Sequence, residues 1–375
     1  FFSFFCIIND YGNINANRWW MDSKVITLFK KIFKIFSINI ILIILFISFV
    51  EVFFGYWFDK DNFGPYMREH RMKNQRILWE DENEKFSYFY RRNYYGFRGK
   101  DIDPSQITGI IMGSSVIDER YKPEKYTITE FLNNKLKTNN FKTTFINAGI
   151  EGQSSAGIVA SFENWLYKLE NFSPKYILFY IGLNDSDHQN LKIADNNAGH
   201  LLNPDNGDVF FDNIKSRSII YDSIRKIKFK YLPRKGFVKY DGKLDEKYKS
   251  SYNFTNYNTL IKKSNLNPFI IKESKQISSY LKRIDKLNEY SKKINSIPIF
   301  ITNIGSYGYS LNLFIYNQSL INHCMEMKYN CIDLAKKIKP KIEYWVDDRH
   351  TTKKGSAAIA NLIFKDLIKI LSENN

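Results

Sequence analysis

Two adjacent serines, Ser114 and Ser115, follow the apolar run 109–112 and a glycine, Gly113. The apolar run predicts a buried strand, and the glycine allows a tight turn at the end of that strand. Because ligands of open α/β sheets bind where the strands end, a serine at this point is placed to act as a nucleophile. A Gly-Ser pair after a strand is more often an ordinary turn, so this interpretation depends on partners elsewhere in the chain.

A histidine near the C-terminus has the acidic neighbour that a general base needs. Asp347 lies three residues before His350, and a closing helical pattern follows them. One turn of chain at this spacing lets the carboxylate hold the imidazole in the tautomer and orientation of a general base. We expect the other four histidines to be surface or packing residues: His70, His188, His200 and His323.

Two further loops carry groups that stabilise negative charge. The glycine-punctuated segment 147–154 leads into a helical pattern, and Asn184 follows the apolar run 176–181. A helix N-terminus suits a phosphate or an oxyanion, but neither the dinucleotide fingerprint nor the Walker pattern is present. We therefore predict that Gly152 donates a backbone N–H group, and Asn184 its side-chain amide, to a developing oxyanion.

Strand and helix patterns alternate from residue 101 to the C-terminus, and these elements must position the candidate residues. Apolar runs predict five strands, at 109–112, 143–146, 176–181, 297–302 and 331–334. Helical spacing of apolar residues lies between them, at 128–136, 159–169 and 277–287. This alternation predicts a mainly parallel sheet that is covered by helices on both faces. The segment at about 187–274 interrupts the rhythm, and we interpret it as an insertion that is a candidate substrate lid.

An apolar segment near the N-terminus is long enough to cross a bilayer. Residues 35–50 carry no charge, and an aromatic stretch continues to Phe58. A signal peptide would need a small-residue cleavage site, which we do not find, and a buried core helix is seldom apolar on all sides. We therefore predict one transmembrane helix at 35–58.

Lysines precede this segment, whereas its far flank mixes both charges. The positive-inside rule then places the tail 1–34 in the cytoplasm, with Met21 as the interpreted natural start. Residues 59–100 are expected to form a stalk and lead-in, and residues 101–375 an extracytoplasmic catalytic domain. The expected localisation is the cell membrane, with a single span.

The chain is basic, with a net charge of +16 and a pI near 9.4. This excess of positive charge would favour binding to an acidic partner. The basic residues are scattered among acidic ones, however, and no nucleic-acid motif is present. We therefore expect no nucleic-acid partner. The three cysteines lack metal-ligand spacing, and only Cys324 and Cys331 are candidates for a disulfide.

Taken together, the four stretches resemble the four blocks of the SGNH (GDSL-like) hydrolase family, in the order and at the strand ends that the family uses. The resemblance covers residues 96–375 and is closest to membrane-anchored bacterial members, which share the lead-in Gly-Phe-Arg-Gly found here at 96–99. It implies a flavodoxin-like three-layer α/β/α sandwich with a mainly parallel five-stranded sheet, and neither a metal nor an organic cofactor. It also implies a Ser-His-Asp triad completed by Asp347 and His350, and an oxyanion hole formed by the nucleophile's N–H, Gly152 and Asn184.

The first block departs from the family pattern, because Gly-Asp-Ser is replaced by Gly-Ser-Ser. If Gly113 is the turn glycine, Ser115 is the nucleophile. If Met112 takes that place, the nucleophile is Ser114, which is less favourable because methionine does not adopt the turn as freely.

The resemblance implies a serine esterase that removes an acyl group, most simply acetyl, from an ester substrate such as a cell-surface polysaccharide. The alternative is a polysaccharide O-acyltransferase that uses the same triad. A second alternative is a catalytically silent glycan-binding module. The complete set of candidate residues argues against that module, since a binding protein would not need all of them.

Overall fold

The computed structural model divides into two compact units, residues 1–57 and 58–375. The structure describes residues 23–58, 75–80, 85–93, 95–187, 214, 217–232, 274–305, 311–339 and 341–374. Half of the expected stalk and lead-in, and most of the candidate lid, therefore lie outside the described residues. His70, His188 and His200 also lie outside them.

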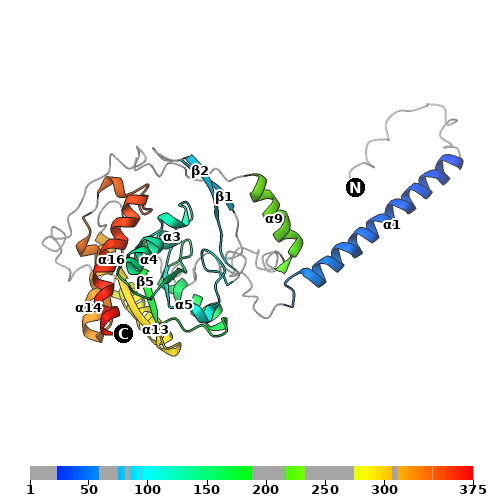
Figure 1. Ribbon diagram of the computed structural model, residues 1–375. Coiled ribbons are helices and arrows are strands. Elements are labelled where there is room, and N and C mark those ends of the chain that lie inside the picture. The colour runs from blue at the N-terminus through cyan, green and yellow to red at the C-terminus, as the bar shows by residue number, and fades with distance from the viewer. Residues whose placement is uncertain are drawn as a thin grey trace, which may run out of the picture. The chain divides into compact units, whose positions relative to one another are not determined.

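The first unit contains helix α1 (Ser23–Phe54), shown in blue in Figure 1. Within it, the segment Lys30–Phe54 could cross a membrane, judged by its length and apolar composition alone. Its 25 residues would span about 38 Å, more than the thickness of a bilayer's hydrocarbon core. The helix ends at Phe54, four residues before the predicted end. Gly55 donates its N–H to the Glu51 carbonyl at 2.8 Å, the last bond of the helical pattern.

A five-stranded parallel sheet forms the centre of the second unit. Its strands in chain order are β3 (Gly109–Gly113), β4 (Phe145–Asn147), β5 (Tyr176–Ile181), β6 (Ile297–Thr302) and β7 (Asn330–Ile332). They lie in the order β4-β3-β5-β6-β7, and every neighbouring pair is parallel. This order is the flavodoxin-like one, so the predicted fold class is confirmed.

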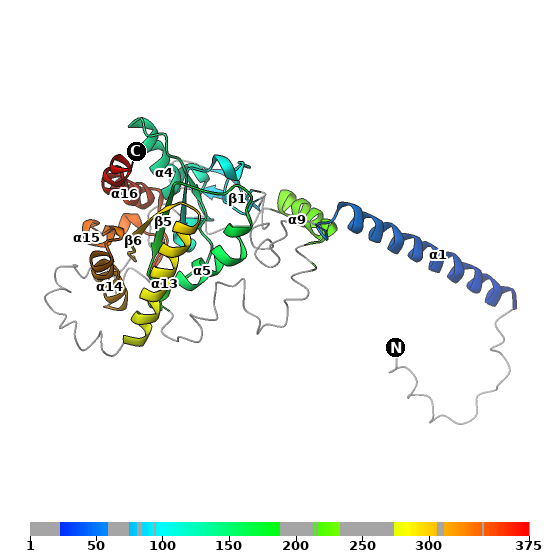
Figure 2. The same ribbon diagram turned by 90° about the horizontal axis from the view of Figure 1, so that it is seen from below.

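Helices cover both faces of the sheet (Figures 1 and 2). The helices are α4 (Ile128–Thr138), α5 (Ser155–Asn164), α13 (Ser274–Lys293), α14 (Leu311–Met327) and α16 (Lys353–Glu373). Ile111 and Leu178 pack with apolar residues of α4 and α16, whereas Ile110 and Ile177 pack with those of α5 and α13. Successive strand residues point to opposite faces, which explains why these strands are apolar at every position.

Three local features differ from the predictions. The helical pattern 159–169 is interrupted, since α5 ends at Asn164 and a short 3-10 turn covers Leu166–Lys168. Trp165, between them, is completely buried and donates its indole N–H to the Tyr95 carbonyl at 2.6 Å. The lead-in contains an unpredicted antiparallel hairpin, β1 (Gln75–Glu80) and β2 (Lys85–Tyr90). An additional helix, α9 (Ile219–Tyr231), lies within the predicted insertion.

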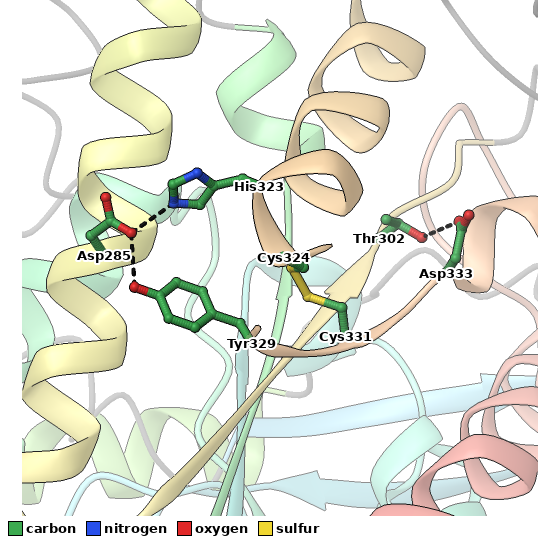
Figure 3. Close-up of a disulfide and its surroundings, with 7 residues drawn as sticks. All are labelled: Asp285, Thr302, His323, Cys324, Tyr329, Cys331 and Asp333. Atoms are coloured by element: carbon green, nitrogen blue, oxygen red, sulfur yellow. Dashed lines mark hydrogen bonds and ion pairs between the residues drawn. A yellow bond between two sulfur atoms is a disulfide. The ribbon is translucent and has the colours of Figure 1, made fainter. Parts of the chain in front are cut away.

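Cys324 and Cys331 form a disulfide that joins α14 to β7 (Figure 3). Beside it, His323 of α14 and Tyr329 share the Asp285 carboxylate of α13, at 2.6 and 3.0 Å. Burial and this carboxylate raise the pKa of Tyr329 to about 12. His323 is thus a partly buried residue that links two helices through Asp285.

Candidate active site

Ser115 stands at a turn that leaves little room for side chains. It is the first residue of the four-residue helix α3 (Ser115–Asp118), directly after β3 and Ser114. A Cβ atom on Gly113 would lie 2.9 Å from the Tyr180 carbonyl oxygen and 2.7 Å from Ile117 Cγ1. Such contacts are too short, so only glycine fits beneath the serines. Ser114 is almost completely buried, whereas Ser115 is partly exposed at the carboxyl edge of the sheet.

His350 is presented by a tight loop before α16. Trp345 and Thr351 form an antiparallel bridge across the loop, and Val346 donates its N–H to the His350 carbonyl at 2.9 Å. Thr352 then caps α16, since its hydroxyl accepts from the Gly355 N–H group. Buried Trp345 at one end and this cap at the other hold the loop in place.

The structure brings Asp347, His350 and Ser115 together in one hydrogen-bonded chain. His350 Nδ1 lies 2.7 Å from Asp347 Oδ2, and His350 Nε2 lies 2.9 Å from Ser115 Oγ. A carboxylate can only accept, so Nδ1 donates and Nε2 is left to accept the serine proton. Burial acts to raise the pKa of Asp347, but hydrogen bonds from His350 and Arg349 outweigh it and hold that pKa below its ordinary value. The carboxylate therefore stays charged at neutral pH.

Gly152 and Asn184 follow the two strands on either side of the strand that leads to Ser115. Gly152 follows β4 and Asn184 follows β5, the two strands that flank β3 in the sheet. Gly152 has a φ of +73°, in the left-handed region that favours glycine. Asn184 belongs to the short helix α6 (Leu183–Asp187), and its buried Oδ1 has no hydrogen-bond partner among the described residues.

The buried carboxylate of Asp185 and the partly buried Arg283 tie these two loops to each other. Asp185, next to Asn184, accepts from the Ser155 N–H group at 3.1 Å and also from the Ser155 hydroxyl. Arg283 of α13 donates its Nε–H to the same hydroxyl at 2.7 Å and approaches Asp185 at 3.4 Å. Because Ser155 begins α5, this carboxylate holds the loop that carries Gly152 against the helix that carries Asn184.

The lead-in residues Arg92 and Arg98 hold the far end of α3. Arg92 Nη2 lies 2.8 Å from Asp118 Oδ1, and both side chains are at most 2 % exposed. Arg98 donates to the carbonyls of Asp118 and Lys122, and Asn147 donates its amide to the Ile117 carbonyl at 2.6 Å. A helix of four residues has few hydrogen bonds of its own, so these contacts satisfy its terminal carbonyls.

A second buried pair lies beyond α3. Lys122 Nζ contacts Glu119, Thr351 and Ser356, so it joins the nucleophile turn to the start of α16. Burial lowers the pKa of Lys122, against the opposing effect of Glu119. Because Thr351 is the next residue after His350, this pair also fixes the position of the histidine loop.

Sequence reasoning identified the residues around Ser115 but missed those that support them. Arg98 lies in the Gly-Phe-Arg-Gly lead-in and Asp185 directly follows Asn184, so both stood beside recognised motifs. Arg92 and Arg283 carried no comparable signal, since each meets its partner only through the fold. Within the described ranges, no group of three or more His, Cys, Asp or Glu side chains is arranged to hold a metal ion.

Comparison with known families gives a match to the GDSL-like lipase/acylhydrolase family over residues 110–363, more than half of the chain. The chain belongs to this family. Membership makes this GDSL-like protein a hydrolase of ester bonds. No curated protein matches the chain.

Solved structures of esterases are similar to this GDSL-like protein. The psychrotrophic esterase EstA from Pseudoalteromonas is 13% identical, with a TM-score of 0.41, over 72% of this chain and 100% of that chain. A variant of the acetyl-xylooligosaccharide esterase Axe2 from Geobacillus is 11% identical, with a TM-score of 0.38, over 69% of this chain and 93% of that chain. At these identities and TM-scores, neither similarity bears on the substrate.

Proposed function

We propose that this protein hydrolyses esters through a covalent acyl-serine, with Ser115 as nucleophile, His350 as general base and Asp347 as the group that orients His350. The observation that carries the proposal is the 2.9 Å contact between Ser115 Oγ and His350 Nε2. Ser115 transfers its proton to Nε2 as its oxygen attacks the ester carbonyl. His350 then returns this proton to the leaving alcohol, and a water molecule releases the acyl group by the same route.

The oxyanion of the tetrahedral intermediate is proposed to bind the Ser115 N–H, the Gly152 N–H and the Asn184 side-chain amide. The first N–H groups of a helix have no acceptor inside that helix, which leaves the Ser115 N–H available. The loops after β4 and β5 approach the same turn from opposite sides, which supports the other two donors. Each such donor typically contributes a factor of roughly a hundred to a thousand in rate.

The proposed substrate is a short acyl ester, most simply an acetyl ester on a cell-surface polysaccharide. A hollow lined by Ser115, His350 and Glu151, among others, lies against the proposed nucleophile. The candidate span and the disulfide support an extracytoplasmic position, where such glycans are found, because disulfides persist in oxidising compartments.

Labelling with a fluorophosphonate probe tests the nucleophile without knowledge of the substrate. We expect Ser115→Ala to abolish labelling and to lower hydrolysis of p-nitrophenyl acetate by on the order of a thousand-fold or more. Ser114→Ala is the matched control, since it removes a hydroxyl one residue away, and it should keep most of both signals. The reverse result would move the nucleophile to Ser114.

Chain-length preference tests the substrate class. The wild-type protein should hydrolyse p-nitrophenyl acetate with a higher kcat/KM than the butyrate and octanoate esters. A preference for octanoate would contradict the proposed acetyl substrate while leaving the nucleophile unaffected.

A further inference from the structure

An ion pair between Arg120 and Glu151 lies beside the proposed nucleophile, and the mechanism above does not use it. Arg120 Nη1 is 2.6 Å from Glu151 Oε2. Both residues line the hollow that also contains Ser115 and His350. Arg120 comes shortly after α3, whereas Glu151 directly precedes Gly152. The pair therefore joins the end of the nucleophile helix to the loop that carries a proposed oxyanion donor.

Arg120 is the more firmly held partner of this pair. Its side chain is 11% exposed, and its guanidinium carbon lies 5.5 Å from the centre of the Tyr90 ring. Its Nε lies 3.6 Å from the buried Asp118 carboxylate. Ion pairs between two mobile surface side chains contribute little, because ordering both side chains costs entropy. Here the surroundings already order one of them, so the pair restrains Glu151 at a lower cost.

Glu151 and Gly152 are the two central residues of a tight turn. Gln153 donates its N–H to the Ile150 carbonyl at 3.2 Å, which closes the turn. The third residue, Gly152, has a φ of +73°, whereas Glu151 does not have a positive φ, so the turn is of type II. Turns of types I and II differ mainly in the orientation of the central peptide group, which here includes the Gly152 N–H. The direction of this N–H therefore depends on the turn remaining in the type II form.

The backbone before the turn is attached to the nucleophile region. Ile150 donates its N–H to the Gly113 carbonyl at 2.9 Å, and Arg92 donates to the Gly149 carbonyl at 2.5 Å. The Arg120–Glu151 pair continues this attachment into the turn itself, through the residue next to Gly152.

We propose that Arg120 and Glu151 are positioning residues that hold the turn 150–153 in its type II form, with the Gly152 N–H directed at the oxyanion. This inference rests on the proposed oxyanion hole. The pair acts through Gly152 and does not bind the substrate itself. Its loss therefore weakens the binding of the transition state and leaves the binding of the ester unchanged.

The test compares full-length variants in detergent. Glu151→Ala and Arg120→Met each remove one partner, and a double variant removes both. Glu163→Ala is the matched control: the Glu163 side chain is also 43% exposed and lies 2.8 Å from Lys286 Nζ, but it does not line the hollow. The measurements are steady-state hydrolysis of p-nitrophenyl acetate and inhibition by a trifluoromethyl ketone, whose adduct with a serine carries an oxyanion. Thermal unfolding is the control for folding.

We expect Glu151→Ala and Arg120→Met each to lower kcat by about ten- to a hundred-fold with little change in KM, because a misplaced donor binds the oxyanion less well. The affinity for the ketone should fall by a similar factor. The double variant should be no worse than the more impaired single variant, since the pair acts as a unit. Arg120→Lys keeps the charge and should retain more activity than Arg120→Met. The control should match the wild-type protein.

Three results would overturn the inference. The first is a wild-type kcat in Glu151→Ala, and the second is a double variant in which the two single effects multiply. The third is an increase confined to KM, which would mean that the pair binds the ester directly. Because Glu151 is partly exposed, its variant decides the question even if Arg120→Met does not fold.

Failure of the proposed function gives a different result. If the ketone does not inhibit the wild-type protein, the proposed serine chemistry is wrong and the positioning role falls with it. If the ketone inhibits the wild-type protein and Glu151→Ala equally, only the positioning role is wrong.

Discussion

Ser114 and Ser115 have the same side chain, and their surroundings distinguish them. The hydroxyl of Ser115 meets His350, whereas Ser114 is buried at the N-cap of α3. The difference comes from Gly113, because the close approach of the Tyr180 carbonyl fixes where the turn begins. Gly113 therefore determines which of the two serines faces His350.

Asn184 provides a test of the proposed oxyanion hole. We expect Asn184→Ala to lower kcat by roughly a hundred- to a thousand-fold with little change in KM, because its amide binds charge that exists only in the transition state. The measurement is steady-state hydrolysis of an acetyl ester, with thermal unfolding as the control for folding. An increase confined to KM would show that Asn184 binds the ground state instead.

The lowered pKa of Asp347 predicts that the stability of the folded protein depends on pH. Its pKa in the folded protein lies below its ordinary value of 3.8, so the charged carboxylate stabilises the folded state above pH 3.8. That contribution is lost as the pH falls through the lowered pKa. We expect Asp347→Asn to be less stable than wild type at pH 7 in urea unfolding, and the difference to shrink below pH 3.8. If the stability difference between wild type and Asp347→Asn does not change with pH, the charge of this carboxylate does not contribute to the stability.

At the scale of elements, the short helix α3 depends on residues that precede the family match. Arg92 and Arg98 lie before residue 110, yet they contact the carboxylate and the carbonyls at the end of α3. The lead-in thus contributes to the core of the catalytic domain. A truncated protein intended to be active should therefore begin before β2.

The Arg92–Asp118 pair allows this dependence to be measured. Arg92→Met removes the nearer cation from the buried Asp118 carboxylate, which keeps the Tyr90 hydroxyl at 2.8 Å and Arg120 at 3.6 Å. Breaking a buried pair completely typically costs about 3–5 kcal/mol, so we expect a smaller loss in the free energy of unfolding, measured in urea, together with a lower kcat. The double variant Arg92→Met, Asp118→Leu should be less destabilised than the sum of the single variants. Additive losses would mean that the two side chains act independently.

At the scale of the whole molecule, the disulfide and the candidate span make the same prediction about topology. The lysines before the span should hold the N-terminal flank in the cytoplasm, and the Cys324–Cys331 disulfide needs an oxidising compartment. We expect alkaline phosphatase fused after Asn375 to be active, and a fused fluorescent protein that folds only in the cytoplasm to be dark. Protection of the catalytic domain from protease in intact spheroplasts would contradict this topology.

The sequence patterns by themselves determined the parallel direction of the strands, and the family resemblance implied their flavodoxin-like order. Apolar runs and helical spacing are local patterns, and the alternation of strand and helix leaves few topologies open. The sequence also placed the candidate residues at strand ends, because each of them directly follows an apolar run or precedes a helix. Strand 176–181 was predicted to the residue, since it is fully buried and therefore apolar throughout.

Only the tertiary structure decided which of these residues meet. The contact between Ser115 and His350 joins positions 235 residues apart, and a one-residue shift at Gly113 would replace one serine with the other. The contacts of Arg92 and Arg283 depend on the same long-range packing, which no local pattern encodes.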